Sequence, residues 1–304
     1  RLEPTKEVKK QSMLEADNIR AANNREAANS RHTNTDKKDS ASPTAFDEET
    51  FISRSDCQSN LNEENPVYHF TVPKDVTLQR NEKGLALIKD SMELRADFLS
   101  LLPRTDHNKI HRELLVRAAK IKGAQNPIAI DATAGFGEDS FLLAAAGFTV
   151  YLFERDPIIA ALLQDALERA AQTPKLAAIA NRMTLIEANS IAELAVLGSG
   201  SSSILTETMR NDFPNKETLR PDVIYLDPMF PERTKSAAVK KKFQLIHILE
   251  NPCENEDELL SAALNVRPRK VVIKRPVKGP FLANVKPSYS LKGKAVRYDC
   301  FVFA

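Results

Sequence analysis

Cysteine is scarce in this chain of 304 residues, and tryptophan is absent. The three cysteines, Cys57, Cys253 and Cys300, lie far apart, with no Cys-x-x-Cys pair and no adjacent histidine. This spacing argues against a zinc site and against a disulfide framework, and it gives no support for a catalytic cysteine. We therefore expect no structural metal and a protein of a reducing compartment.

Long hydrophobic runs and a strong net charge are missing as well. The longest apolar stretch, FLLAAAGFTVYLF (141–153), is too short to span a bilayer and is interrupted by a glycine. The N-terminus is polar with mixed charge and does not resemble a signal peptide. Because the net charge is only +2, any affinity for nucleic acid must come from local clusters of basic residues. We expect a cytoplasmic protein that does not bind membranes.

Large apolar residues are sparse in the first part of the chain. Residues 1–65 are rich in Asn, Ser, Lys, Glu and Asp, which predicts a polar extension that is disordered or loosely helical. Residues 66–108 contain short, partly alternating runs separated by Pro-Lys-Asp and Asn-Glu-Lys-Gly, which predicts a small antiparallel β unit. Residues 109–304 form the third predicted region, which is the main domain.

The third region alternates between short apolar runs and helical patterns. IAI (128–130) and VYLF (150–153) are continuously apolar, as expected for parallel strands buried on both faces. Further strands are predicted at 182–188, 222–226, 269–276 and 295–303, and helices at 109–121, 190–197, 235–249 and 257–266. Residues 198–221 are rich in turn formers and predict a surface insertion. The order predicts an α/β fold, a doubly wound, Rossmann-like sheet that is mostly parallel with an antiparallel C-terminal edge strand.

The first strand of the alternation leads into the turn DATAGFGED, in which Asp131, Gly135 and Gly137 are candidate ligand-binding residues. Glycines between a buried strand and a helix let a ligand approach the backbone near the positive end of the helix. Glu154 ends the next strand about 20 residues further on, where a carboxylate can accept hydrogen bonds from both ribose hydroxyls. Ser140 stands where a dinucleotide motif has its third glycine. The pattern therefore favours an adenosine-type ligand without pyrophosphate, such as S-adenosylmethionine (SAM), with a ligand-free structural turn as the alternative.

A second polar cluster follows the fourth strand, in YLDPMFPERTKSAAVKKKF (225–243). Asp227 is expected at the carboxyl edge of the sheet, where it would face the same crevice as the glycine turn. An exocyclic purine amine is a poor nucleophile because its lone pair is delocalised into the ring. The Asp227 carboxylate and the Pro228 carbonyl would accept both amine protons and localise the lone pair, while Phe230 would stack on an extruded base. An ordinary Asp-Pro turn at a strand end is the alternative.

Basic residues surround this cluster and are candidate contacts for the phosphates of a polyanion. Any one of them, taken alone, is a solvated surface charge, but their grouping beside the expected site favours nucleic acid as the partner. The candidate RNA-binding residues are Arg233, Lys235, Lys240, Lys241, Lys274 and Arg275.

Three segments resemble one known family. DATAGFGEDSFLLAAAGFTVYLFERDPIIAALLQDAL, VIYLDPMFPERTKSAAVKKK and KVVIKRP are similar to ribosomal RNA small subunit methyltransferase J, with a resemblance that covers about residues 66–304. The resemblance implies a class I methyltransferase sheet and transfer of a methyl group from SAM to the N2 amine of a guanine in 16S rRNA. It implies 16S rRNA or the small ribosomal subunit as partner. It also implies a cofactor pocket formed by Glu138, Asp139, Glu154, Arg155, Asn189, Ser190 and Asp227.

Departures from the family pattern leave other readings open. Glu138 and Asn189 stand where the family has Arg and Ser, and TDHNKIHREL (105–114) replaces a glycine-rich segment. One alternative is an N6-adenine or protein-glutamine methyltransferase, because Asp/Asn-Pro-x-aromatic motifs serve several planar amines; their motif more often has proline where Met229 stands. Another is a non-catalytic RNA-binding adaptor on the same fold. The sequence indicates no particular oligomeric state.

Overall fold

The computed structural model describes residues 76–90, 92–213, 220–228 and 255–303, together with two short strands, β1 (Ile52–Ser53) and β2 (Val67–Tyr68). β1 and β2 pair antiparallel. All of these residues belong to one compact unit within Glu48–Ala304. The helix predicted at 235–249 and most of the predicted polar extension (1–65) lie outside the described residues. The division into 1–65, 66–108 and 109–304 stays a prediction.

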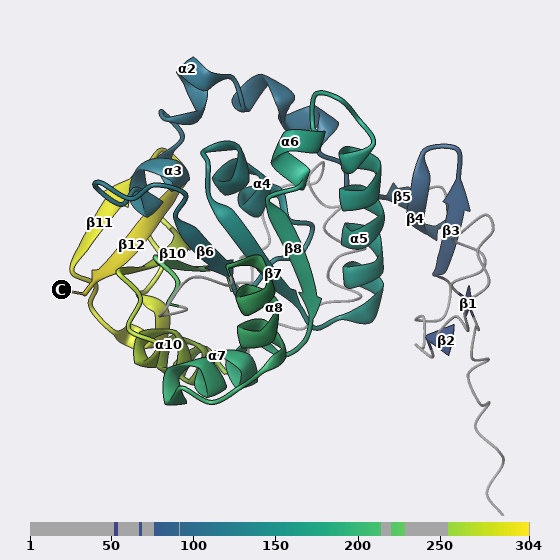
Figure 1. Ribbon diagram of the computed structural model, residues 1–304. Coiled ribbons are helices and arrows are strands. Elements are labelled where there is room, and N and C mark those ends of the chain that lie inside the picture. The colour runs from purple at the N-terminus through teal and green to yellow at the C-terminus, as the bar shows by residue number, and fades with distance from the viewer. Residues whose placement is uncertain are drawn as a thin grey trace, which may run out of the picture. The chain divides into compact units, whose positions relative to one another are not determined.

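A mostly parallel sheet forms the centre of the described structure (Figure 1). Its seven strands lie in the order β11-β12-β10-β9-β6-β7-β8, and β10, β9, β6, β7 and β8 are parallel to one another. This confirms the predicted α/β sheet. The strand bounds are β6 (Ile128–Asp131), β7 (Thr149–Glu154), β8 (Met183–Glu187), β9 (Val223–Leu226), β10 (Lys270–Pro276), β11 (Tyr289–Lys292) and β12 (Val296–Val302).

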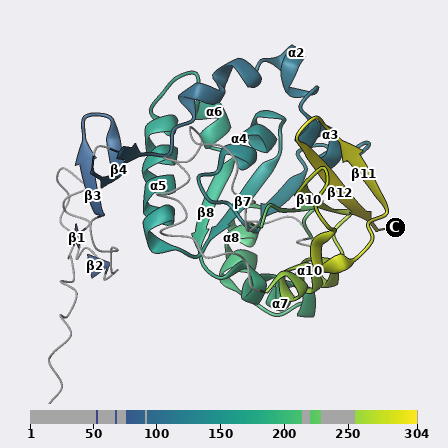
Figure 2. The same cartoon turned by 180° about the vertical axis from the view of Figure 1, so that it is seen from behind.

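Helices cover both faces of the sheet (Figures 1 and 2). Ala129 and Val150 pack on the side of α3, α4, α5 and α6, whereas Ile128 and Tyr151 pack on the side of α7, α8 and α10. Apolar side chains on both faces explain the continuous apolar runs in the sequence. The bounds are α3 (Leu114–Ala119), α4 (Glu138–Ala145), α5 (Pro157–Ala171), α6 (Ala177–Ala180), α7 (Ser190–Ser199), α8 (Ile204–Asp212) and α10 (Glu256–Asn265).

The C-terminal strand differs from its prediction in one respect. β12 is antiparallel to β10, as expected, but it is not the edge of the sheet because β11 pairs along its other side, from Tyr289↔Cys300 to Lys292↔Arg297. β11 went unpredicted because the four residues YSLK include no buried side chain and so carry no core signal.

Two predictions for segments outside the sheet were wrong in detail, one for a surface insertion and one for a helix. The predicted surface insertion (198–221) contains α8, because Ser203 and Thr206 form a capping box and Leu205 and Met209, one turn apart, are buried. The segment 109–121 forms two short helices, α2 (His107–Ile110) and α3, because the backbone of Glu113 is extended between them (φ −56°, ψ 131°).

The predicted β unit is an antiparallel sheet of β3 (Thr77–Asn81), β4 (Gly84–Lys89) and β5 (Met92–Leu94), followed by the short helices η2 (Leu99–Arg104) and α2. Its apolar face packs against Ile158 and Leu162 of α5. Arg80 also forms an ion pair with the buried Asp165 on the same helix, with 2.8 Å between Nη1 and Oδ1. The β unit is therefore anchored on the helix that follows β7. Among the described residues, no helix is long and apolar enough to cross a membrane.

Candidate active site

The glycine turn between β6 and α4 is held by the strands on both sides of β6. The Ala132 amide donates to the Tyr225 carbonyl of β9 (3.0 Å), and the Ala134 amide donates to the Phe153 carbonyl of β7 (3.0 Å). Gly135 and Gly137 have positive φ (52° and 70°), which glycine adopts without strain. The turn therefore has one defined shape at the carboxyl edge of the sheet.

The two glycines of the turn have different environments. A Cβ on Gly137 would lie 2.8 Å from the Leu163 side chain on α5, so close packing as well as positive φ requires glycine there. Gly135 is partly exposed, and its amide donates to Glu154 Oε2 at 3.0 Å. Gly135 is thus the glycine that lies beside the candidate ligand carboxylate.

Glu154 lies at the end of β7 and is only 8% exposed. Its Oε1 accepts from the Asp156 amide at 2.8 Å, while Oε2 accepts from Gly135. Burial raises the pKa of Glu154, although the hydrogen bonds from these amides oppose the shift. A carboxylate oxygen can accept more than one hydrogen bond, so this fixed carboxylate retains acceptor capacity for ribose hydroxyls.

Asp131 supports the turn from within the sheet. Its Oδ2 accepts from the Ser140 hydroxyl at 2.6 Å and its Oδ1 from the Thr133 amide at 3.0 Å, and the residue is 1% exposed. Burial raises the pKa of Asp131 to about 7. The serine in place of a third glycine therefore anchors a buried carboxylate, and Asp131 would position the turn rather than present itself to solvent.

Asp227 lies directly against the glycine turn. Its amide donates to the Thr133 hydroxyl at 2.7 Å, which ties the tip of β9 to the turn after β6. The Asp227 side chain is 37% exposed, so one part of the carboxylate remains open to a ligand. The two clusters expected to share one crevice are therefore adjacent.

Lys274 joins Asp227 to α4. Its ammonium donates to Asp139 Oδ2 at 2.7 Å and to Asp227 Oδ2 at 2.8 Å, and the Tyr225 hydroxyl donates to the same Asp139 oxygen at 2.5 Å. Burial works to lower the pKa of Lys274, but the two carboxylates outweigh burial and raise it, so the ammonium stays charged. The sequence indicated a phosphate contact at this position; the structure places the lysine between two acids.

The pKa of Asp227 is the balance of opposing effects. Burial raises this pKa, the charge of Lys274 lowers it, and the negative charge of Asp139 raises it. Lys274 is therefore the main group that favours an ionised Asp227, with a smaller contribution from the charge of Arg275. Ile273 of β10 pairs with Leu226 of β9 in the parallel register, so Lys274 and Asp227 are the next residues along two neighbouring strands. The signal in the sequence was that both residues directly follow an apolar strand run.

The other predicted site residues differ in how far they are exposed to solvent. Glu138, Arg155 and Asn189 are exposed and Ser190 is partly exposed, and the Asn189 side chain caps α7 by accepting from the Ile191 amide at 3.0 Å. Arg275 has a fully buried side chain that pairs with Glu256 at 3.1 Å, so its guanidinium does not face a phosphate in this fold. Outside the described residues lie Phe230, Arg233, Lys235, Lys240 and Lys241.

The charges at this edge suit SAM. Asp139, Glu154 and Asp227 lie near the glycine turn, with Lys274 between two of them. Such an acidic rim would repel a pyrophosphate but would attract the sulfonium and ammonium groups of SAM. The Glu154 carboxylate at the end of β7 is the predicted acceptor for the ribose hydroxyls. Within the described ranges, no group of three or more His, Cys, Asp or Glu residues is arranged to hold a metal ion.

The strand order and the acidic side chains beside the glycine turn are those of a SAM-dependent methyltransferase of class I. A family model for SAM-dependent methyltransferases matches residues 61–303. More specifically, the chain belongs to the ribosomal RNA small subunit methyltransferase J family, whose members it matches over much of their length. This confirms the family resemblance and SAM as the cofactor.

Two relatives and one solved structure illustrate the similarity. Ribosomal RNA small subunit methyltransferase J from Nitrosococcus oceani is 44% identical over 191 residues, which is 63% of this chain and 68% of the relative. The protein of the same name from Pseudomonas aeruginosa (strain LESB58) is 42% identical over 233 residues, or 75% and 82% of the two chains. A SAM-dependent methyltransferase from Neisseria gonorrhoeae superposes with a TM-score of 0.57 at 29% identity, covering 76% of this chain and 84% of that one.

Changing Glu154 to Gln should weaken SAM binding about tenfold, because a charged acceptor for ribose hydroxyls becomes a neutral amide that also carries donors. Isothermal titration calorimetry with SAM would measure the change. Glu168→Gln, the same substitution on the exposed side of α5, is the matched control and should bind like wild type. Equal affinities in the two variants would contradict the assignment of Glu154 to the cofactor.

Proposed function

We propose that this protein transfers a methyl group from SAM to the exocyclic N2 amine of a guanine in 16S rRNA, either free or within the small ribosomal subunit. The hydrogen bond from the Asp227 amide to the Thr133 hydroxyl (2.7 Å) supports the proposal, because it ties the Asp-Pro motif to the glycine turn that is the proposed cofactor site. The names of the relatives supply the RNA class. An rRNA substrate would place the reaction in the cytoplasm.

The motif would act by orienting and polarising the amine. Lys274 occupies Asp227 Oδ2, so Oδ1 is the oxygen that would accept one amine proton. The Pro228 carbonyl would accept the other, and the ring of Pro228 restricts its backbone. These bonds favour a pyramidal nitrogen whose lone pair points at the methyl group. Phe230 remains the proposed stacking platform for the base.

SAM, when bound, supplies an electrophilic methyl group on a sulfonium. The protein's remaining tasks are to place the amine in line with that methyl group and to stabilise the positive charge that develops on the nitrogen. An ionised Asp227 stabilises this positive charge directly. The same carboxylate, or water, would take the proton that the amine loses after transfer.

Methylation of isolated small subunits, of protein-free 16S rRNA and, in parallel, of DNA with labelled SAM tests the proposal. We expect incorporation into one guanine, identified as N2-methylguanosine by mass spectrometry of nuclease digests. Label found only in DNA, at adenine N6 or in a protein glutamine would replace the proposal with the corresponding alternative. No turnover on any of these substrates would favour the non-catalytic adaptor.

The predicted phosphate contacts Arg233, Lys235, Lys240 and Lys241 remain part of the proposal, since they follow the Asp-Pro motif directly. Lys274 and Arg275 no longer belong to this set. Their ion pairs with Asp139, Asp227 and Glu256 give them a place in the site and in the fold.

A further inference from the structure

The segment that follows β10 has an unusual charge composition. Acidic and basic residues are nearly balanced over the whole chain, 41 against 43, yet residues 276–298 contain no Asp or Glu. Four lysines in this segment are exposed: Lys278, Lys286, Lys292 and Lys294. A positively charged surface without carboxylates is complementary to a phosphate backbone.

Part of this segment lies at the same edge of the sheet as Asp227. β10 runs parallel to β9, so its end at Pro276 lies at the carboxyl edge, two residues after Lys274. β12 starts there too, because Val296 pairs with Pro276 and the Val277 amide donates to the Ala295 carbonyl at 3.3 Å. The loop 277–281 and the turn 292–295 are therefore neighbours, and we call them together the loop-and-turn surface.

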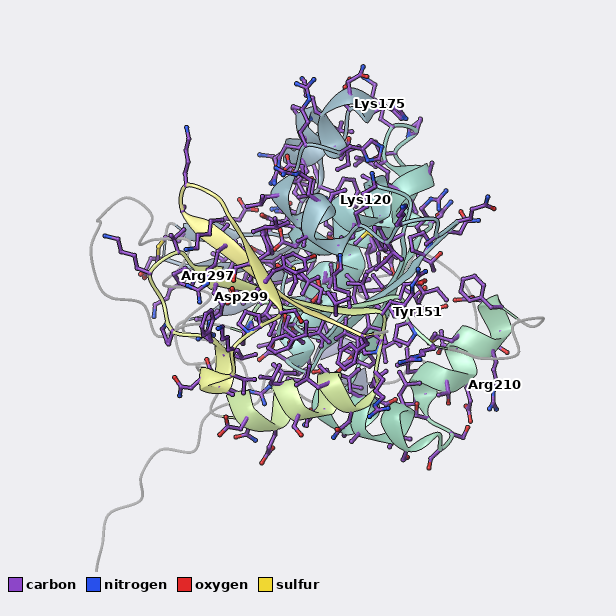
Figure 3. All side chains as sticks on the ribbon, turned by 90° about the vertical axis from the view of Figure 1, so that its left-hand side faces the viewer. Lys120, Tyr151, Lys175, Arg210, Arg297 and Asp299 are labelled. Atoms are coloured by element: carbon purple, nitrogen blue, oxygen red, sulfur yellow. The ribbon has the colours of Figure 1, made fainter. Side chains whose placement is uncertain are left out.

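A buried arginine holds the loop in place. Arg297, which is 4% exposed, donates through Nη1 to the carbonyls of Pro276 (2.7 Å), Val277 (3.0 Å) and Gly279 (2.9 Å). Its Nε pairs with Asp299 at 2.9 Å, and Figure 3 shows the two side chains next to each other. These hydrogen bonds use the Nε and Nη1 donors of the Arg297 side chain. Arg297 therefore shapes the surface instead of contacting a ligand.

The same arginine orients an exposed aromatic ring. The guanidinium carbon lies 5.1 Å from the centroid of the Phe281 ring, within the range of a cation–π contact. Phe281 nevertheless remains 36% exposed, so part of its ring is accessible from solvent. Exposed Lys278, Lys292 and Lys294 belong to the same surface. An aromatic ring beside lysines is the combination that binds single-stranded nucleic acid, by base stacking and phosphate contacts.

We propose that the loop-and-turn surface binds the single-stranded RNA that flanks the target nucleotide. Phe281 stacks on a neighbouring base, Lys278, Lys292 and Lys294 contact phosphates, and Arg297 keeps the loop rigid. The inference rests on the proposed function and adds a second RNA-binding element to it, which comes later in the chain than the Arg233–Lys241 cluster. Stacking and phosphate contacts here would hold the strand while the target base enters the crevice.

Charge reversal at two positions tests the phosphate contacts. We expect Lys278→Glu/Lys294→Glu to raise the Kd for 16S rRNA at least tenfold at about 0.1 M salt, and to reduce the slope of log K against log salt by about 1.4. The matched control is Lys120→Glu/Lys175→Glu, two exposed lysines in segments that lead into the amino ends of β6 and β8 (Figure 3). This control should retain most of the wild-type affinity.

Phe281→Ala tests stacking separately and should weaken RNA binding roughly tenfold with little change in the salt slope. SAM affinity, measured by calorimetry, should stay at the wild-type value in every variant, which also shows that each is folded. If the wild type methylates rRNA but the variants bind it as the control does, the inference is overturned and the proposed function stands. If the wild type neither binds nor methylates rRNA, the proposed function fails.

A membrane surface is the other anionic partner that exposed lysines could bind. Flotation of the wild type and the lysine variants with vesicles that contain anionic lipid would test this partner. Lysine-dependent binding to vesicles, together with unchanged RNA affinity in the same variants, would overturn the RNA assignment.

Discussion

Asp227→Ala is expected to lower kcat for rRNA methylation by about 10²–10⁴-fold. The loss of SAM affinity should be much smaller, because Asp139 and Glu154 remain beside the glycine turn. The carboxylate is the charged acceptor for the substrate amine, whereas the contact of residue 227 with the glycine turn uses its backbone amide and survives the substitution. Single-turnover methylation with labelled SAM, at saturating rRNA, would measure the loss in the chemical step.

Asp227→Asn separates charge from shape in the same experiment. Asparagine keeps the side-chain volume and one acceptor oxygen but loses the negative charge that stabilises the developing cation, so we expect a loss of similar order. Asp257→Asn, an exposed carboxylate in the first turn of α10, is the control and should react at the wild-type rate. Wild-type turnover in either Asp227 variant would remove Asp227 from the reaction.

Lys274→Met is expected to reduce kcat/KM at least tenfold near pH 7 and to displace the acid limb of the pH profile to higher pH. Lys274 is one of the positive groups that lower the pKa of Asp227 against burial and against the charge of Asp139; Arg275 is another and remains in the variant. Without Lys274 the Asp227 pKa rises. A reaction that needs the carboxylate ionised proceeds above this pKa and is lost as the pH falls through it.

The displacement is expected toward higher pH because an opposite charge in direct contact with Asp227 is lost. Measuring kcat/KM from pH 5 to pH 9 would show it. Lys274→Arg keeps the charge and should restore the wild-type position of the limb, although the fork geometry of arginine lowers the absolute rate. A uniform loss at every pH in Lys274→Met, with no displacement, would mean that Lys274 is only structural.

Most of the fold was predictable because buried parallel strands leave a clear pattern. IAI, VYLF and VIYL are apolar at every position since helices cover both faces of the sheet. β11 and α8 were missed for opposite reasons. β11 has no buried residue, whereas the Ser and Thr residues before and within α8 indicate a turn unless the buried Leu205 and Met209 are also considered.

At the site, the sequence by itself determined the chemical groups and the strand ends that carry them: the glycine turn after β6, Glu154 at the end of β7 and Asp227 after β9. Parallel strands bring their carboxyl ends to one edge, so these groups had to meet. Only the tertiary structure decided what the basic residues do. Lys274 lies between two carboxylates, and Arg275 and Arg297 are buried. The residue type fixes the sign of a charge. The burial of that side chain and its ion-pair partners depend on which strands are neighbours in the sheet.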